Sequence, residues 1–93
     1  MPRPDVPTAQ PDAPVRLSSL PLGHAGVIER IDRDDPIARR LMDLGFVPST
    51  EVRVLRRAPL GDPVAYEIRG SRLCLRHSES KLVWVRPLGA RQA

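Results

Sequence analysis

The segment from Leu41 to Pro63, with the sequence LMDLGFVPSTEVRVLRRAPLGDP, constrains the fold more than any other part of the chain. Leu41 and Leu44 end the apolar face of a predicted helix. Gly45 follows where a left-handed C-terminal cap is needed, because glycine adopts positive φ without a steric penalty. Pro48 then prevents the helix from resuming. The segment therefore predicts a helix that ends at a tight turn and a chain that continues as a strand.

A short loop with strong turn chemistry follows that strand. Residues 51–57 alternate between apolar and charged side chains, which predicts the strand itself. The residues expected to fix the shape of the next loop are Pro59, Gly61, Asp62 and Pro63. Leu60 stands at the tip of this loop, where a small core has no evident means of burying it. The sequence thus predicts a shaped loop that presents an apolar side chain.

The rest of the chain predicts a mainly β domain with five short strands. The first is expected at residues 24–32, and the others recur at intervals of about ten residues. The side chains predicted to share one face of their strand are Val27 and Ile31, Val52 and Val54, and Val64, Tyr66 and Ile68. Leu73 and Leu75 are expected to point inward. Val83 and Val85 alternate with Leu82 and Trp84, so both faces of the last strand are expected to be at least partly covered. This alternation indicates a small antiparallel barrel, whose closure would remove exposed strand edges.

One helix is expected between the first and second strands. Asp35 is a favoured N-cap and Pro36 suits the first helical position, so together they mark its start. Ile37, Leu41 and Leu44 then recur on one face, which we expect to pack against the core. A short helical turn is also expected at residues 78–81, between the last two strands.

The folded domain is expected to span residues 15–88. Residues 1–14 contain five of the eleven prolines and few large apolar side chains, so we expect a disordered tail. Residues 89–93 are expected to form a C-terminal tail. The side chains expected to seat the start of the domain against the core are Leu17, Leu20 and Leu22.

Composition excludes several classes of protein. The 93 residues allow one small domain, and no apolar run approaches the roughly 18 residues of a membrane-spanning helix. A single cysteine, Cys74, cannot form an intrachain disulfide, and the N-terminus has no secretory signal pattern. We therefore expect a cytoplasmic protein without direct membrane insertion.

No catalytic constellation is found in the sequence. His24 and His77 lie far apart, the glycines stand singly in turns, and Cys74 has no evident histidine partner. We therefore expect a protein that is not an enzyme and requires no cofactor. His77 and Glu79 are candidate ligands for an adventitious divalent metal, or for one that bridges a homodimer. Ordinary solvated side chains are the favoured interpretation of this pair.

The charge favours an acidic partner without identifying it. The net charge is +4, and all but one of the 15 basic residues are arginine. Phe46, Tyr66 and Trp84 are the only aromatic residues, too few for the stacking platforms of single-strand binders. A nucleic-acid interface is therefore the disfavoured alternative. A strand face on which arginines pair with Glu51 and Glu67 explains the pattern equally well.

Two motifs resemble the ferrous iron transport protein A family, FeoA. They are the helix end Leu41-Met42-Asp43-Leu44-Gly45-Phe46-Val47-Pro48 and the loop from Ala58 to Pro63, with a weaker match at Leu73-Cys74-Leu75-Arg76. The chain departs from the family pattern at Ser49, where glycine is common. Serine there implies either a different turn or about 1 kcal/mol of strain.

The resemblance implies an SH3-like barrel and a role as an accessory or regulator of ferrous iron uptake. Its implied partner is a FeoB-type transporter, a membrane protein with a cytosolic GTPase domain. A regulatory module acting with a metal-dependent repressor is the alternative that the resemblance implies.

Docking on such a partner requires exposed side chains. Leu60 is the first candidate because it stands at the loop tip. Phe46 and Val47 are candidates to extend an apolar patch with it, although core packing is the favoured interpretation of Phe46. Met42 and Arg39 are further candidates on the helix.

Overall fold

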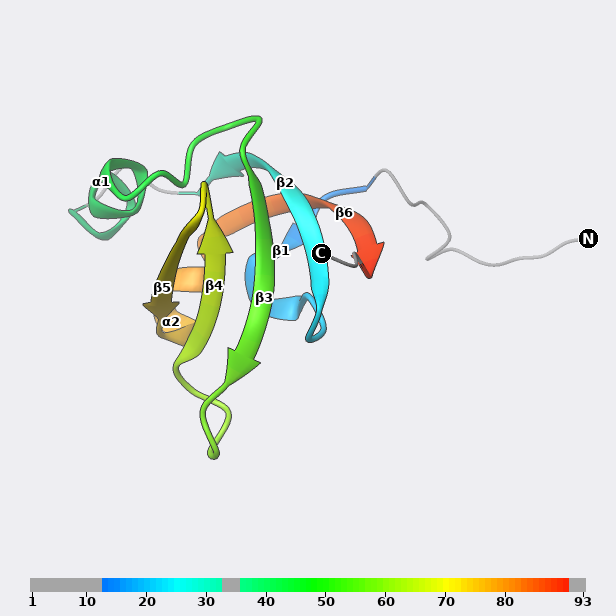
Figure 1. Cartoon of the computed structure of the whole chain (residues 1–93). Coiled ribbons are helices and arrows are strands. Elements are labelled where there is room, and N and C mark those ends of the chain that lie inside the picture. The colour runs from blue at the N-terminus through cyan, green and yellow to red at the C-terminus, as the bar shows by residue number, and fades with distance from the viewer. Residues whose placement is uncertain (1–12, 33–35, 91–93) are drawn as a thin grey trace, which may run out of the picture.

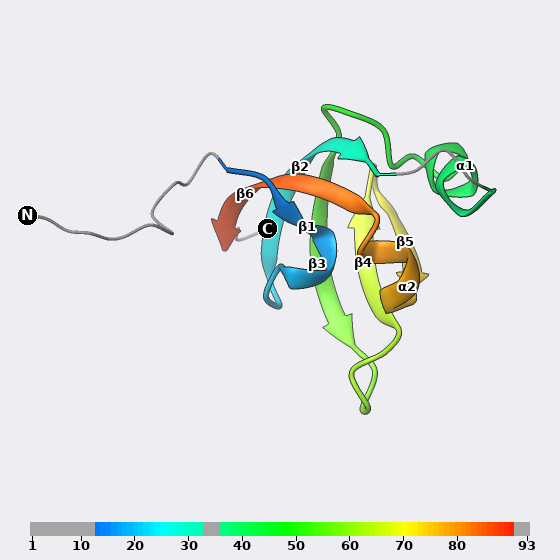
Figure 2. The same cartoon turned by 180° about the vertical axis from the view of Figure 1, so that it is seen from behind.

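The computed structural model describes residues 13–32 and 36–90. In this part of the chain a curved antiparallel sheet is accompanied by short helices (Figures 1 and 2). The elements are β1 (Val15–Arg16), a 3-10 helix (Leu17–Ser19), β2 (His24–Ile31), α1 (Pro36–Asp43), β3 (Glu51–Arg57), β4 (Val64–Ile68), β5 (Ser71–Leu75), α2 (His77–Ser80) and β6 (Val83–Ala90). The expected tail before residue 13, the expected cap at Asp35 and residues 91–93 lie outside the described residues.

The predicted mainly β architecture with one early helix is confirmed. The five predicted strands correspond to β2, β3, β4, β5 and β6, while the two-residue strand β1 was not expected. A short helix lies between the last two strands as expected, and it begins one residue early, at His77. The helix after the first long strand also lies where the sequence placed it.

The strands are ordered β1-β6-β2-β3-β4-β5, and every neighbouring pair is antiparallel. Within the described residues β5 pairs with β4 alone, so it forms one edge of the sheet and β1 forms the other. The expected closure that leaves no strand edge is therefore wrong. Because α2 separates β5 from β6, the last strand returns to pair with β2 and β1 instead of with β5.

The core lies inside the curve of the sheet and takes fully buried side chains from every strand except β1, whose Val15 packs against it while partly buried. Its buried members are Leu17, Leu20, Ile28, Leu41, Phe46, Val52, Val54, Val64, Tyr66, Ile68, Leu75, Val83 and Val85. Leu73 packs against this cluster but is only partly buried. Most predicted core residues are thus confirmed, because strict alternation makes the inward face of a strand readable.

Two predictions about core packing at the start of the domain are corrected. Leu22 is 53% exposed, because the turn at Gly23 carries it outward while Leu17 and Leu20 remain buried. In β2, Ile28 is buried and Ile31 packs against the core, whereas Val27 is half-buried outside the core cluster, so Val27 and Ile31 do not share a face as expected. An irregularity in pairing between Ile28 and Arg30 shifts the phase of the strand, and single-residue alternation cannot anticipate such a bulge.

Helix α1 lies at one end of the molecule and does not cover the sheet (Figures 1 and 2). Ala38 and Leu41 are buried, but Ile37 and Leu44 are each 40% exposed. The expectation that Ile37 and Leu44 pack in the core is therefore wrong. A helix of eight residues at the rim offers only a narrow line of contact to the rest of the fold.

The end of α1 has the predicted glycine cap. Gly45 has a φ of +114°, and its N–H donates to the carbonyl of Met42 at 3.0 Å. The N–H of Phe46 donates to the carbonyl of Leu41 at 3.0 Å, which completes a Schellman motif. The cap directs the chain back so that Phe46 enters the core.

Ser49 adopts the left-handed conformation that the sequence departure suggested. Its φ is +74°, and its N–H donates to the carbonyl of Ile28 at 2.8 Å. The chain thus makes the turn that suits glycine, and of the two predicted alternatives the strained one applies. A serine in this region is disfavoured by about 1 kcal/mol because its Cβ crowds the backbone.

A compact polar cluster joins β1, β2 and β6 on the outside of the sheet. The guanidinium carbons of Arg16 and Arg30 lie 4.4 Å and 4.7 Å from the ring centre of Trp84. Trp84 Nε1 donates to Asp32 Oδ1 at 3.0 Å, and Arg16 Nη1 donates to the carbonyl of Lys81 at 2.6 Å. The Trp84 hydrogen bond and the two arginines hold the pKa of Asp32 below its usual value.

Candidate functional site at the loop between β3 and β4

The loop between β3 and β4 presents the most exposed of the large apolar side chains that the structure describes. Leu60 is 96% exposed. The loop between β3 and β4 extends at the bottom of both views, away from α1 in their upper part (Figures 1 and 2). The N–H of Ala58 donates to the carbonyl of Pro63 at 3.0 Å, and that of Gly61 donates to the carbonyl of Ala58 at 2.7 Å. The loop is therefore shaped by its own backbone, and it holds Leu60 away from the core.

The base of the loop is tied to the helix that follows β5. Asp62 Oδ1 accepts a hydrogen bond from the backbone N–H of His77 at 2.9 Å. This N–H belongs to the first turn of α2, where backbone donors have no partner within the helix. Asp62 therefore fixes the loop against a second element and does not simply favour a turn.

An open groove of about 550 Å³ lies beside this loop. Its apolar lining includes Leu22, Pro59, Pro63 and Ala65, and its wall includes Arg56 and Arg57. Together with Leu60 these side chains form a surface that we call the loop face: Leu22, Arg56, Arg57, Pro59, Leu60, Pro63 and Ala65. Sequence reasoning missed Leu22 and the groove, because both depend on how two distant turns meet.

The other candidates for partner binding do not join the loop face. Phe46 is fully buried, so the proposal that it extends an exposed patch is wrong, and the favoured core interpretation applies. Val47 is partly buried next to it. Met42 and Arg39 are exposed on α1, which lies far from the loop between β3 and β4 (Figure 1).

A second exposed apolar surface is found at the α1 end. Ile37, Met42 and Leu44 are 40%, 39% and 40% exposed, and we call these three residues the helix patch.

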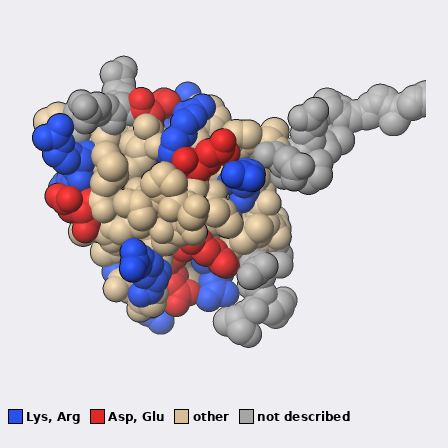
Figure 3. Space-filling model, turned by 90° about the horizontal axis from the view of Figure 1, so that it is seen from above, with Lys and Arg blue, Asp and Glu red and all other residues tan. Residues whose placement is uncertain are grey.

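Figure 3 views the molecule from above and shows a central area free of Lys, Arg, Asp and Glu, with charges of both signs around it. That view shows no concentration of positive charge of the kind expected of a nucleic-acid interface.

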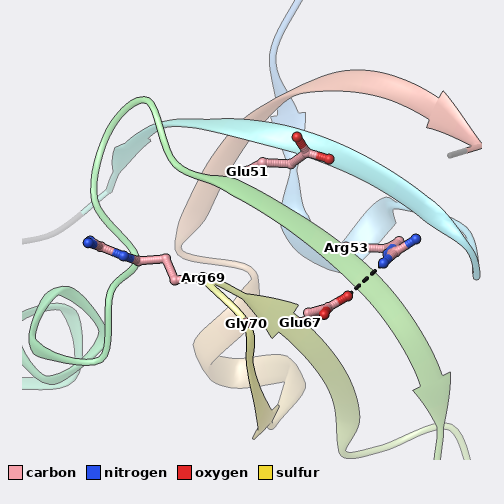
Figure 4. Close-up of a pocket in the computed structure, with 5 residues that line it drawn as sticks. All are labelled: Glu51, Arg53, Glu67, Arg69 and Gly70. Carbon is pink, nitrogen blue, oxygen red and sulfur yellow. Dashed lines mark hydrogen bonds and ion pairs between the residues drawn. The ribbon is translucent and has the colours of Figure 1, made fainter. Parts of the chain in front are cut away.

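The outer face of β3 and β4 carries arginines that are matched by glutamates. Arg53 Nη2 lies 2.7 Å from Glu67 Oε1 across the two strands (Figure 4). The same hollow is lined by Glu51 and Arg69, whose side chains point away from each other. The predicted pairing of strand arginines with glutamates is therefore present for Arg53 and Glu67.

The candidate metal ligands His77 and Glu79 lie in α2. Glu79 Oε2 accepts a charged hydrogen bond from Arg40 Nη2 at 2.9 Å, and Glu79 Oε1 accepts one from the N–H of Arg76 at 2.8 Å. Both carboxylate oxygens of Glu79 are thus engaged. No group of three or more His, Cys, Asp or Glu residues within residues 13–32 and 36–90 is arranged to hold a metal ion.

None of the helices in the described part of the chain has the length and apolar character needed to cross a membrane.

Comparison with known proteins decides the family. The model of the FeoA domain family matches residues 15–87. The chain belongs to the FeoA family. This family is associated with ferrous iron transport, and its solved members share the SH3-like fold described above.

Individual FeoA relatives agree with this assignment. A FeoA/FeoB fusion protein of Porphyromonas gingivalis is 34% identical over 71 residues, which are 76% of this chain but only 8% of that protein. The zinc-bound FeoA of Stenotrophomonas maltophilia is 41% identical with a TM-score of 0.70, covering 76% of this chain and 88% of that one. The FeoA-like protein of Clostridium acetobutylicum is 31% identical with a TM-score of 0.78, covering 86% and 93%.

Proposed function

We propose that this FeoA protein is a non-enzymatic cytoplasmic accessory of ferrous iron uptake that docks on a FeoB-type transporter through the loop face. The observation that carries the proposal is the 96% exposure of Leu60 on a loop whose shape is fixed by hydrogen bonds. When a partner covers a large apolar side chain that is exposed to water, the free energy of the system falls. The fixed loop also reduces the entropy lost on binding.

The composition of the loop face fits a protein partner. Leu60 and the apolar groove beside it provide a central area that excludes water, and Arg56 and Arg57 stand at its edge. Interfaces commonly have an apolar centre, and arginine is enriched in them. Arg57 is held in place because its Nη2 donates to the carbonyl of Leu20 at 3.0 Å.

The fusion relative supports the choice of partner. In the Porphyromonas gingivalis protein a FeoA segment and a FeoB segment belong to one polypeptide. Fusion keeps two modules at a high effective concentration, which is useful when they act together. The present chain matches 8% of that protein, and the partner we propose for it is the cytosolic part of such a transporter.

Iron uptake in cells tests the proposal. In a strain that lacks this gene, we expect the parent chain to restore ferrous iron uptake and Leu60→Asp to fail at equal protein levels. Met42→Asp in the helix patch is the matched control, since it places the same charge on exposed apolar surface at the other end. If Leu60→Asp restores uptake as well as the parent does, Leu60 is not a docking residue.

A further inference from the structure

The outer edge of β5 is open. Within residues 13–32 and 36–90 β5 has a hydrogen-bonded neighbour on one side only, and both views show no strand beyond it (Figures 1 and 2). β5 is five residues long, in contrast to the two residues of β1 at the other edge. Short strands, proline, bulges and charged side chains normally protect an edge, and of these β5 has only the charge of Arg72 in its run Ser-Arg-Leu-Cys-Leu.

The turn before β5 determines which backbone groups face the open edge. Arg69 and Gly70 have φ values of +53° and +81°, as in a two-residue hairpin turn with both central residues left-handed. Ile68 and Ser71 close this turn, so they form a hydrogen-bonded pair. Alternation then makes Leu73 bond towards β4, whereas the N–H and C=O groups of Arg72 and Cys74 point outward.

Within residues 13–32 and 36–90, no backbone or side-chain hydrogen bond occupies these four groups. After β5, the next backbone group with a hydrogen bond outside the sheet is the carbonyl of Arg76, which accepts from the N–H groups of Glu79 and Ser80. The open part of the edge therefore consists of Arg72 and Cys74. This spacing matches two successive bonding positions of an added antiparallel strand.

The side chains of β5 specify what an added strand should carry. Arg72 is exposed on the outer face, and no carboxylate in the described residues lies within ion-pair distance of it. The facing residue of β4, Glu67, is already paired with Arg53 at 2.7 Å. Leu73 packs against the core from the inner face but is only partly covered. An added strand would thus place acidic side chains beside Arg72 and apolar side chains beside Leu73.

We propose that the β5 edge binds an extended acidic segment of a partner protein as an additional strand, with alternating acidic and apolar side chains. Backbone bonds to Arg72 and Cys74 would supply affinity, and the charge of Arg72 and the uncovered part of Leu73 would select the sequence. A second copy fits less well, because its β5 carries arginine as its only charged residue and would bring like charges together. This inference does not depend on the identity of the transporter or on Leu60.

A designed peptide tests the proposal on the 93-residue chain. The probe is a blocked peptide of sequence Glu-Val-Glu-Val-Glu-Val-Glu, and amide hydrogen exchange is followed residue by residue by NMR. We expect exchange at the amides of Arg72 and Cys74 to slow roughly tenfold when the peptide is at about ten times its Kd, since only free protein exchanges there. The amide of Leu73, which faces β4, serves as the internal control and should change little.

Two matched probes separate strand addition from simple charge attraction. The same peptide with every second backbone nitrogen methylated keeps its charge but cannot form the bonds, and we expect it to give no protection. Arg72→Glu should lower the affinity for the acidic peptide by roughly fivefold to tenfold at low salt. The same change should raise the affinity for a peptide with lysine in place of glutamate. Arg86→Glu, on the distant strand β6, makes the same change in net charge and should leave binding unchanged.

Three results would overturn the proposal. They are the absence of protection at Arg72 and Cys74 with the acidic peptide, equal binding of the methylated peptide, and protection of the two amides that depends on protein concentration without peptide. The last would assign the edge to a second copy. Cys74 also lines the groove of the loop face, so the two surfaces adjoin. None of these results tests Leu60 itself, so the two proposals fail separately.

Discussion

The carboxylate of Asp62 accepts a hydrogen bond from the backbone N–H of His77, with 2.9 Å between Oδ1 and N. This single contact joins the loop that carries Leu60 to the helix that follows β5. The loop itself has few buried contacts, because Leu60, Gly61 and Asp62 are exposed. The position of Leu60 therefore depends on a bond to a different part of the fold.

Replacement of Asp62 should loosen the loop without unfolding the domain. We expect Asp62→Ala to lower the free energy of unfolding by about 1 kcal/mol, the usual effect of losing one hydrogen bond at a helix N-terminus. Asp62→Asn keeps the accepting oxygen and should behave close to the parent. NMR order parameters of residues 58–63 measure the loop directly. Equal order in Asp62→Ala and the parent would show that the contact does not hold the loop.

Ser49 provides a test of stored strain. Because its φ is +74°, Ser49→Gly should raise the free energy of unfolding by roughly 0.5–1 kcal/mol. Ser49→Ala is the matched control, since alanine has the same Cβ and should give no gain. Urea denaturation of the three proteins measures the difference. A Ser49→Gly protein that is no more stable than Ser49→Ala would contradict the assignment of strain to this residue.

The cluster around Trp84 predicts a dependence of stability on pH. The pKa of Asp32 is lowered below 3.8 in the folded protein, first by the hydrogen bond from Trp84 and then by Arg16 and Arg30. A carboxylate with a lowered pKa stabilises the fold above its unfolded pKa, and this contribution is lost as pH falls through the folded pKa. Asp32→Asn should therefore be less stable than the parent near neutral pH and equally stable in strong acid.

Urea denaturation at both pH values measures this convergence. Asp43→Asn is a suitable control, because Asp43 is an exposed carboxylate at the end of α1 and its substitution should have little effect at either pH. A gap between the parent and Asp32→Asn that persists in strong acid would show that the contribution of Asp32 does not come from its charge.

Chelation tests the alternative of a metal-bridged homodimer through His77 and Glu79. Both oxygens of Glu79 are engaged, by Arg40 and by the N–H of Arg76, so a metal would have to displace a charged partner. We therefore expect the mass in solution to be the same with and without EDTA, and the same for His77→Ala. A shift towards the monomer mass on adding EDTA, absent in His77→Ala, would establish the metal bridge instead.

Local patterns in the sequence were sufficient for most of the fold. The glycine cap at Gly45 and the inward side chains of β3 and β4 follow from φ preferences and strict alternation. At Ser49 the sequence predicted either strain or a different turn, and the structure has the strained one. These features depend on neighbours within a few residues. The same locality explains why the exposure of Leu60 could be expected from a loop built of proline, glycine and aspartate.

Features that depend on distant contacts could not be predicted. The bulge in β2 changes the face on which Val27 lies. The exposure of Ile37 depends on the position of α1 at the rim of the sheet. Leu22 lines the groove because its turn meets the loop before β4, and no pattern near Leu22 indicates this. The open edge of β5 likewise results from the path of β6 across the sheet.

Direct binding tests the central claim, which is docking through the loop face. The measurement is calorimetric titration of this chain into the cytosolic domain of the FeoB-type transporter of the same organism, with and without guanine nucleotide. We expect saturable binding by the parent and by Met42→Asp. Leu60→Asp should raise Kd by at least roughly 30-fold, equivalent to about 2 kcal/mol for a buried central contact. Binding by Leu60→Asp with the Kd of the parent, or no binding by the parent in any nucleotide state, would contradict the account.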